Sequence, residues 1–125
     1  MVWKIGNVEI KNQVCLAPMA GVSNPAYMKI CEEMGCGYAI TELISAEAIV
    51  RGNKKTLDML KGYEDLNMPV AVQLFGSDPE VMAKASEHVV RVNRFEIIDI
   101  IPDGLSYSIR KINRAFWLIK HDMVY

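Results

Sequence analysis

The feature that most constrains the fold is an alternation of apolar runs with helix-like segments along the first hundred residues. The apolar runs are residues 14–17, 38–41, 70–75 and 95–100. Runs that are apolar at consecutive positions, rather than at every second one, are typical of parallel strands buried on both faces. The alternation therefore predicts an α/β fold with about four parallel strands and intervening helices.

A short β-hairpin is expected before this series. Residues 3–13 alternate apolar and polar side chains around Gly6-Asn7, a pair suited to a tight turn. The strand predicted at 14–17 then ends at Pro18. We expect that strand to be buried, like the three that follow it.

Capping residues mark the expected helix ends. The expected N-caps are Asn24, Ser45 and either Ser77 or Asp78. Apolar residues at helical spacing are Tyr27, Ile30, Cys31 and Met34 in the first helix, Ala46, Ile49 and Val50 in the second, and Val81, Met82, Ala85, Val89 and Val90 in the third. A break near Gly52-Asn53 precedes a further helical turn through Leu57 and Leu60.

Two architectures fit this order: a doubly wound sheet, or the N-terminal half of a TIM (β/α)₈ barrel. The chain has 125 residues, about half of the ~250 of a full barrel. In both architectures the chemistry gathers at the carboxyl ends of the strands. Those ends are the 18–21 segment, Glu42, Gln73 and the residues that follow Asp99-Ile100.

Composition and simple motifs exclude several classes of function. The net charge of −1 gives no sign of a nucleic-acid or membrane surface. No apolar run is long enough to span a membrane and no export signal is seen, so we expect a cytoplasmic protein. Neither a Rossmann nor a P-loop glycine motif occurs.

The cysteines and histidines do not predict a metal site. Cys15, Cys31 and Cys36 lie in or beside apolar segments and are expected to be reduced, buried thiols. No second ligand pair follows Cys31 and Cys36, so zinc is not expected. His88 is expected on a helix surface, and His121 has no evident partner.

Gln73 is the most informative single residue, because it interrupts an otherwise apolar strand. A buried carboxamide must find hydrogen-bond partners. It suits the edge of a flavin or pyrimidine ring, but equally a bond to a neighbouring strand inside a barrel.

Three other positions are weaker candidates. The small residues at 18–21 would let backbone amides meet a ring carbonyl or phosphate, although such loops are common in α/β proteins. Glu42 and Asp99 end strands and suit an acid, base or ligand. A bond to a neighbouring amide is the more ordinary role for both.

The segment LAPMAGVSNPAYMKICEEMGCGYAITELISAEAI, followed by PVAVQLFGSDPEVMAKA and FEIIDI, closely resembles the first half of bacterial tRNA-dihydrouridine synthases. The resemblance covers residues 3–100. It implies an FMN-binding (β/α)₈ barrel followed by a helical domain that grips tRNA. It also implies hydride transfer from FMN, reduced by NADPH, to carbon 6 of a uridine turned out of the RNA stack.

The resemblance also implies site residues. Pro18, Met19 and Ala20 match the first flavin-contacting loop, and Gln73 matches the amide that bonds the isoalloxazine edge. Glu42 is only a pocket candidate, and no metal is implied. The motifs PMAGVS and QLFG disfavour other flavin barrels, such as the dihydroorotate or old-yellow-enzyme type.

The chain departs from the family pattern after Ile100. The family continues with N-M-G-C-P, whose cysteine gives a proton to carbon 5, whereas this chain has IPDG at 101–104 and no cysteine after Cys36. No catalytic residue is therefore carried over. The family's later flavin ligands would lie beyond residue 125.

We interpret residues 1–100 as a partial FMN-binding barrel and 101–125 as a divergent tail. Codons for residues 103–106, read one base later, can spell Met-Gly-Cys-Pro, so our hypothesis is a shifted reading frame in a truncated chain. The expected consequences are impaired activity and self-association through exposed half-barrel edges. The alternative is a non-enzymatic half-barrel remnant or the product of a pseudogene.

Overall fold

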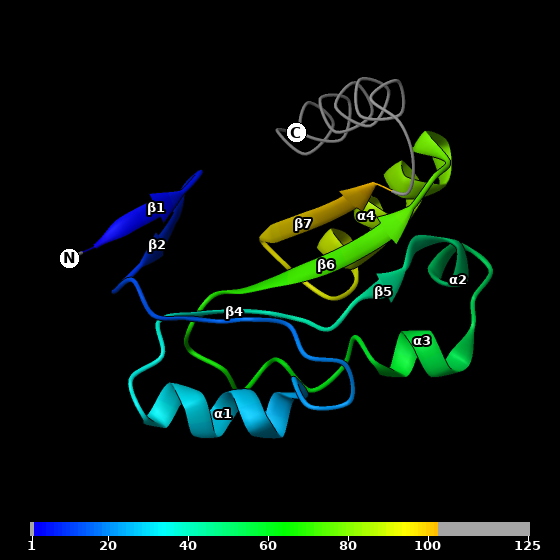
Figure 1. Ribbon diagram of the computed structural model, residues 1–125. Helices are drawn as coiled ribbons and strands as arrows, with labels where there is room; N and C mark the ends of the chain where they lie inside the picture. The colour runs from blue at the N-terminus through cyan, green and yellow to red at the C-terminus, as the bar shows by residue number, and fades with distance from the viewer. Residues whose placement is uncertain (1, 103–125) are drawn as a thin grey trace.

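The protein is described by a computed structural model, which places residues 2–102 (Figure 1). Its elements are β1 (Trp3–Ile5), β2 (Val8–Ile10), β3 (Cys15–Leu16), α1 (Pro25–Glu33), β4 (Tyr38–Ile40), β5 (Ile44–Ser45), α2 (Ala46–Val50), α3 (Lys54–Asp58), β6 (Val70–Gly76), α4 (Pro79–Arg91) and β7 (Ile97–Pro102). The shifted motif predicted at 103–106 and His121 lie outside the described residues.

The central sheet is parallel and follows the order of the sequence. β3 pairs with β4, β4 pairs with β6, and β7 lies on the opposite edge of β6. The short strand β5 pairs further along β6 on the β4 side, so β4 and β5 act as one interrupted strand. A doubly wound sheet reverses its strand order. The described strands do not, which confirms the N-terminal half of a TIM barrel with four parallel strand positions.

The interruption between β4 and β5 has a local cause at Thr41. Its backbone N–H donates to Ala71 O at 2.9 Å, and its hydroxyl oxygen accepts the Gln73 N–H at 2.9 Å. The hydroxyl thus replaces a backbone carbonyl as the partner of β6. The ladder resumes where Ile44 pairs with Leu74, a strand that the sequence pattern did not predict.

The predicted helix caps are confirmed. Asn24 Oδ1 accepts the Tyr27 N–H at 2.9 Å, and Ser45 Oγ accepts the Ala48 N–H at 3.2 Å. Of the two residues considered for the last long helix, Asp78 is the cap. It accepts the Glu80 N–H at 2.9 Å, and Pro79 occupies the first turn as predicted.

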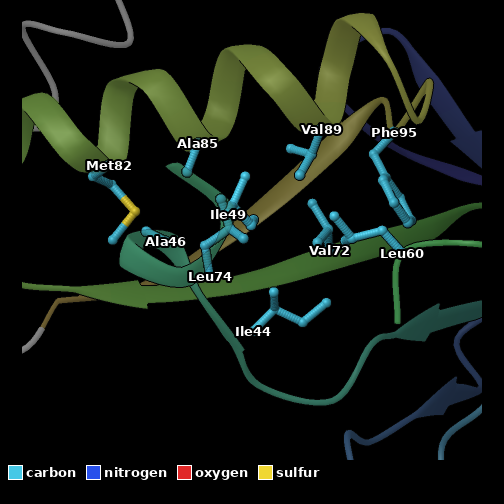
Figure 2. Packing of buried hydrophobic residues seen from close by; sticks show 10 residues of the cluster. All are labelled: Ile44, Ala46, Ile49, Leu60, Val72, Leu74, Met82, Ala85, Val89 and Phe95. Atoms are coloured by element: carbon cyan, nitrogen blue, oxygen red, sulfur yellow. The ribbon is translucent and has the colours of Figure 1, made fainter. Parts of the chain in front are cut away.

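The larger core lies between β6 and the helices α2 and α4 (Figure 2). Figure 2 shows Met82, Ala85 and Val89 of α4 pointing toward the strand face that carries Val72 and Leu74. This confirms the predicted stripe of α4, with Val81 and Val90 partly buried at its margins. Those apolar contacts hold the sheet against its helical layer.

The hairpin of β1 and β2 covers the amino end of the other sheet face. β1 and β2 pair antiparallel, as predicted. Ile10 is fully buried and packs with Tyr38, Ala71 and Ile97, the first inner-face residues of three parallel strands. We call this sheet face, opposite the helices, the inner face.

The predicted stripe of α1 is wrong in part. Ile30 and Met34 are 60% and 84% exposed, whereas Met28 is fully buried beside Ala39 and Met68. The rotation of α1 follows from Glu32, one turn beyond Met28. Its carboxylate accepts the N–H groups of Asn67 and Met68, at 2.6 and 2.5 Å, and so turns this side of the helix toward the sheet.

The prediction of a buried first strand is also wrong. Val14 is 58% exposed and Cys15 is exposed, because β3 is an edge strand of the described sheet. Of the three cysteines expected to be buried, only Cys36 is, and Cys31 is half-buried. Val50, one of the apolar residues at helical spacing in α2, is also exposed.

Candidate functional site

The candidate site lies at the carboxyl ends of the strands, beyond the part that the hairpin covers. It contains the loop 17–23 after β3, Thr41 and Glu42 after β4, Gln73 in β6 and Asp99 in β7. Figure 1 shows the hairpin beside the opposite, amino ends. The parallel sheet thus brings together the positions that the sequence singled out separately.

Gln73 and Asp99 form a polar pair on the inner face. The two residues are register partners in β6 and β7, and Gln73 Nε2 donates to Asp99 Oδ2 at 2.9 Å. One step earlier on the same face, the corresponding partners are the apolar Ala71 and Ile97. The predicted bond from Gln73 to a neighbouring strand is therefore present. It uses only the amide nitrogen, because among residues 2–102 no hydrogen bond occupies Gln73 Oε1.

The loop 17–23 is held in place by its own hydrogen bonds. The Met19 N–H donates to Ser23 Oγ at 2.7 Å, and Met19 O accepts the N–H groups of Val22 and Ser23 at 3.0 and 2.9 Å. Ser23 is fully buried beneath the loop. Met19 and Ala20 are left exposed on its outer surface, beside the half-buried Pro18.

Glu42 fastens this loop to the neighbouring strand. The Gly21 N–H donates to Glu42 Oε2 at 2.8 Å, and Gly21 has a φ of 73°, which favours glycine. The expectation that backbone amides at 18–21 are free is therefore wrong for Met19 and Gly21. Glu42 has the ordinary role considered for it, a bond to a neighbouring amide.

Two tyrosines lie close to the acidic groups of the site. Burial raises the pKa of Tyr38 to about 12, and Cys15 and Asp99, both negatively charged at the high pH where this tyrosine titrates, add to the effect. Burial likewise raises the pKa of Tyr63 to about 12, with Glu42 adding. Both phenols stay protonated at neutral pH, so each can donate a hydrogen bond but cannot serve as a base.

Sequence reasoning missed two residues that shape the site, Thr41 and Ser23. Both are fully buried hydroxyls that bind backbone amides of site segments. A signal for Thr41 was present, since a hydroxyl at the end of an apolar strand needs a partner. Asp99 was only one of the weaker candidates from the sequence, although it interrupts the apolar run of β7 just as Gln73 interrupts that of β6.

Other candidates lie away from this end. His88 is half-buried on α4. A hollow of about 520 Å³ is lined by residues around 60–70 and 92–97, at the amino ends of β6 and β7, and contains none of the predicted site residues. Within residues 2–102 no cluster of His, Cys, Asp or Glu could hold a metal ion. No helix in that range is long and apolar enough to cross a membrane.

Comparison with known proteins gives a consistent result. The family model described as dihydrouridine synthase matches residues 15–101. The tRNA-dihydrouridine synthase B of Pasteurella multocida is 34% identical over 111 residues, which cover 89% of this chain and 32% of that protein. The protein of the same name from Vibrio cholerae is 33% identical over 89% of this chain and 33% of its own length.

A relative with a less specific name matches a shorter part of the chain. A probable tRNA-dihydrouridine synthase of Treponema pallidum is 34% identical over 96 residues, which cover 77% of this chain and 28% of that protein. The chain thus spans about a third of the length of the curated relatives it matches.

Proposed function

The chain belongs to the dihydrouridine synthase family, and on that premise we propose that it forms the first half of an FMN-binding barrel for the reduction of uridine in tRNA. The observation that carries the proposal is the Gln73–Asp99 pair on the inner face, just beyond the apolar part that the hairpin covers. Among residues 2–102, no hydrogen bond occupies the amide oxygen of Gln73. The names of the relatives support a substrate in tRNA, and on that basis we further propose that the enzyme is cytoplasmic.

The described residues fit the ring portion of FMN. Gln73 Oε1 is an acceptor, and the isoalloxazine ring carries an imide N–H between two carbonyl groups. The exposed side chains of Met19 and Ala20, with Pro18 beside them, offer an apolar surface after β3, which β4 separates from the strand of Gln73. These four residues are the ones we assign to flavin binding.

When bound and reduced by NADPH, FMN would supply a hydride to carbon 6 of uridine, while carbon 5 would take up a proton, so that the 5,6 double bond becomes the single bond of dihydrouridine. The chain's own contribution is to hold the ring. Gln73 fixes its edge, and Glu42 keeps the loop 17–23 in place through Gly21. Met19 cannot readily shift, because Ser23 binds its amide.

A second candidate function is a non-enzymatic half-barrel, favoured by one observation. Where the family has N-M-G-C-P, this chain has Ile101, Pro102 and Asp103, and its sequence has no cysteine after Cys36. The proton donor that the resemblance implies is therefore missing at its motif position. We infer that the 125-residue chain binds flavin but reduces uridine slowly or not at all.

Flavin binding and product formation test these two functions separately. Titration of the purified chain with FMN, followed by flavin fluorescence, is expected to show binding that Gln73→Ala weakens by about tenfold. Asn67→Ala removes an exposed carboxamide at the amino end and is the matched control. Absence of FMN binding contradicts the proposed function. Dihydrouridine in tRNA after incubation with FMN and NADPH would instead show that the missing cysteine is dispensable.

We further propose that the chain self-associates through its edge strands. β3 and β7 each have one edge that no strand among residues 2–102 pairs with. Unpaired strand edges favour pairing with another chain. Light scattering after gel filtration is expected to give a mass above the 14.1 kDa of one chain, and a monomer at all concentrations would contradict this.

A further inference from the structure

We propose that Asp99 is a positioning residue, which fixes the orientation of the Gln73 carboxamide and so selects a ring that presents an imide N–H. The inference rests on the proposed flavin site and goes beyond it. The family resemblance assigns Gln73 to the flavin but gives Asp99 no role. The structure supplies that role through the 2.9 Å bond between Gln73 Nε2 and Asp99 Oδ2.

The bond determines which way the carboxamide faces. A carboxylate can only accept hydrogen bonds, so the NH₂ group of Gln73 must face Asp99. The flipped amide would place Oε1 against Oδ2, two acceptors without a proton between them. The oxygen of Gln73 is therefore directed away from β7, and no hydrogen bond among the described residues occupies it.

The backbone on both sides leaves little freedom for a different arrangement. Gln73 and Asp99 are register partners in adjacent parallel strands. The Gln73 N–H is bound by the hydroxyl of Thr41 at 2.9 Å, which fixes β6 on its other edge. The inner-face pairs on either side are apolar, Ala71 with Ile97 and Phe75 with Ile101, and their side chains offer no competing partner. Asp99 is thus the residue that decides the direction of the amide.

This orientation has a chemical consequence for the ligand. An amide oxygen accepts from a ring N–H, whereas an amide nitrogen would meet that N–H as a second donor. A flavin methylated at N3 keeps its two ring carbonyls but loses the imide proton. It therefore reports on whether Gln73 presents its oxygen.

The first test needs no flavin. In ¹⁵N-labelled chain, the side-chain NH₂ signals of Gln73 are identified by their absence in Gln73→Leu. We expect them to lie apart from those of exposed carboxamides, and to move to the exposed positions in Asp99→Leu. Signals that stay unchanged in Asp99→Leu would overturn the inference.

The second test compares FMN with N3-methyl FMN. In the unsubstituted chain, methylation is expected to weaken binding by at least about tenfold, and in Asp99→Asn by less than about threefold, because the amide is free to turn. Glu96→Gln removes an exposed carboxylate just before the same strand and should leave the tenfold ratio intact.

The outcomes separate this inference from the proposed function. If the unsubstituted chain and Asp99→Asn bind FMN with equal sensitivity to methylation, the positioning role is wrong and the flavin site stands. If the unsubstituted chain binds no FMN, the proposed function is wrong, and the NMR signals alone decide whether Asp99 orients Gln73.

Discussion

Two adjacent levels of the inner face differ sharply, although they are only two residues apart along each strand. At the amino end, Ala71 and Ile97 are register partners that pack under the hairpin with Ile10. At the next level toward the carboxyl ends, the inner-face partners are Gln73 and Asp99, which bond to each other. Beyond them the partners are apolar again, Phe75 and Ile101. The same backbone pairing thus supports an apolar level under the hairpin and a polar level immediately beyond it.

Residues of the same strand can therefore serve different roles, because those near its amino end stabilise the fold and those further along are available for binding. Residues at the amino end of such a sheet secure the fold, and those at the carboxyl end contact ligands. Substitutions at the two ends should therefore change different measurements. The following predictions use that separation, from the largest expected effect to the smallest.

Ile10→Ala should have the largest effect on stability. Removing a fully buried side chain leaves a cavity between the hairpin and the sheet, so we expect the free energy of unfolding to fall by about 3 kcal/mol. Urea denaturation measures this change. FMN affinity of the folded chain should stay within about twofold, since the cavity lies at the other end of the face.

The control for Ile10 is Val14→Ala, which shortens an exposed aliphatic side chain beside the same sheet. It should change the free energy of unfolding by no more than about 0.5 kcal/mol. An equal loss of unfolding free energy in the two variants would show that the hairpin is not tightly packed against the sheet.

The double variant Gln73→Leu, Asp99→Leu replaces the bonded polar pair by two apolar side chains, like those at the level of Ala71 and Ile97. We expect FMN binding to weaken by about thirtyfold, or ~2 kcal/mol, while the free energy of unfolding changes by less than about 1 kcal/mol. Replacing both partners leaves no polar atom without its bond, which is why stability should be spared. A large loss of stability would mean that the pair is part of the core.

Thr41→Val tests the residue that joins the two strands at the border. The valine leaves the Gln73 N–H without its 2.9 Å partner, so the free energy of unfolding should fall by about 1.5 kcal/mol. Thr56→Val on α3 is the matched control, because its hydroxyl only donates to the exposed Asn53, and it should cost less than about 0.5 kcal/mol. Thermal denaturation of both variants compares them directly.

A charged group, the Glu32 carboxylate, also lies near the amino end of β6, where it accepts backbone N–H groups of Asn67 and Met68. Burial alone would raise the pKa of Glu32, yet hydrogen bonds from Lys29, Met68 and Asn67 hold it below the ordinary value of 4.5. The carboxylate therefore stabilises the fold above pH 4.5, and this contribution is lost as the pH falls through the lowered pKa.

Glu32→Gln should lower the free energy of unfolding by about 1 kcal/mol at pH 7, and the gap to the unsubstituted chain should narrow toward pH 3. Urea denaturation at several pH values measures it. Glu33→Gln changes the adjacent exposed carboxylate and is the control. If the difference in free energy of unfolding between Glu32→Gln and the unsubstituted chain is as large at pH 3 as at pH 7, the proposed role of the charge is wrong.

Much of the fold could be predicted because its signals are local. The caps Asn24, Ser45 and Asp78, the hairpin turn and the apolar strands each follow from a few neighbouring residues. The gathering of Gln73, Glu42 and the loop 17–23 at one end also follows, since the carboxyl ends of parallel strands share an edge.

The remaining features depend on contacts between distant segments. The rotation of α1 is set by the bond from Glu32 to the backbone of Asn67 and Met68, about 35 residues away, which no helical periodicity contains. The pairing of Gln73 with Asp99 depends on the register of β6 against β7. Parallel strands are joined by a crossover, here the one that contains α4, so no tight turn fixes their register, and the register depends on which side chains the sheet buries.

The sequential order of the strands also bears on how the chain folds during synthesis. β4 joins β3, β6 joins β4, and β7 joins β6, so each new strand finds its partner in chain that has already emerged. Short sequence separations between contacting segments favour fast folding, and domains fold from the N-terminus as they are made. The sheet can therefore form one strand at a time as the chain leaves the ribosome, and the hairpin is the first element that later strands pack against.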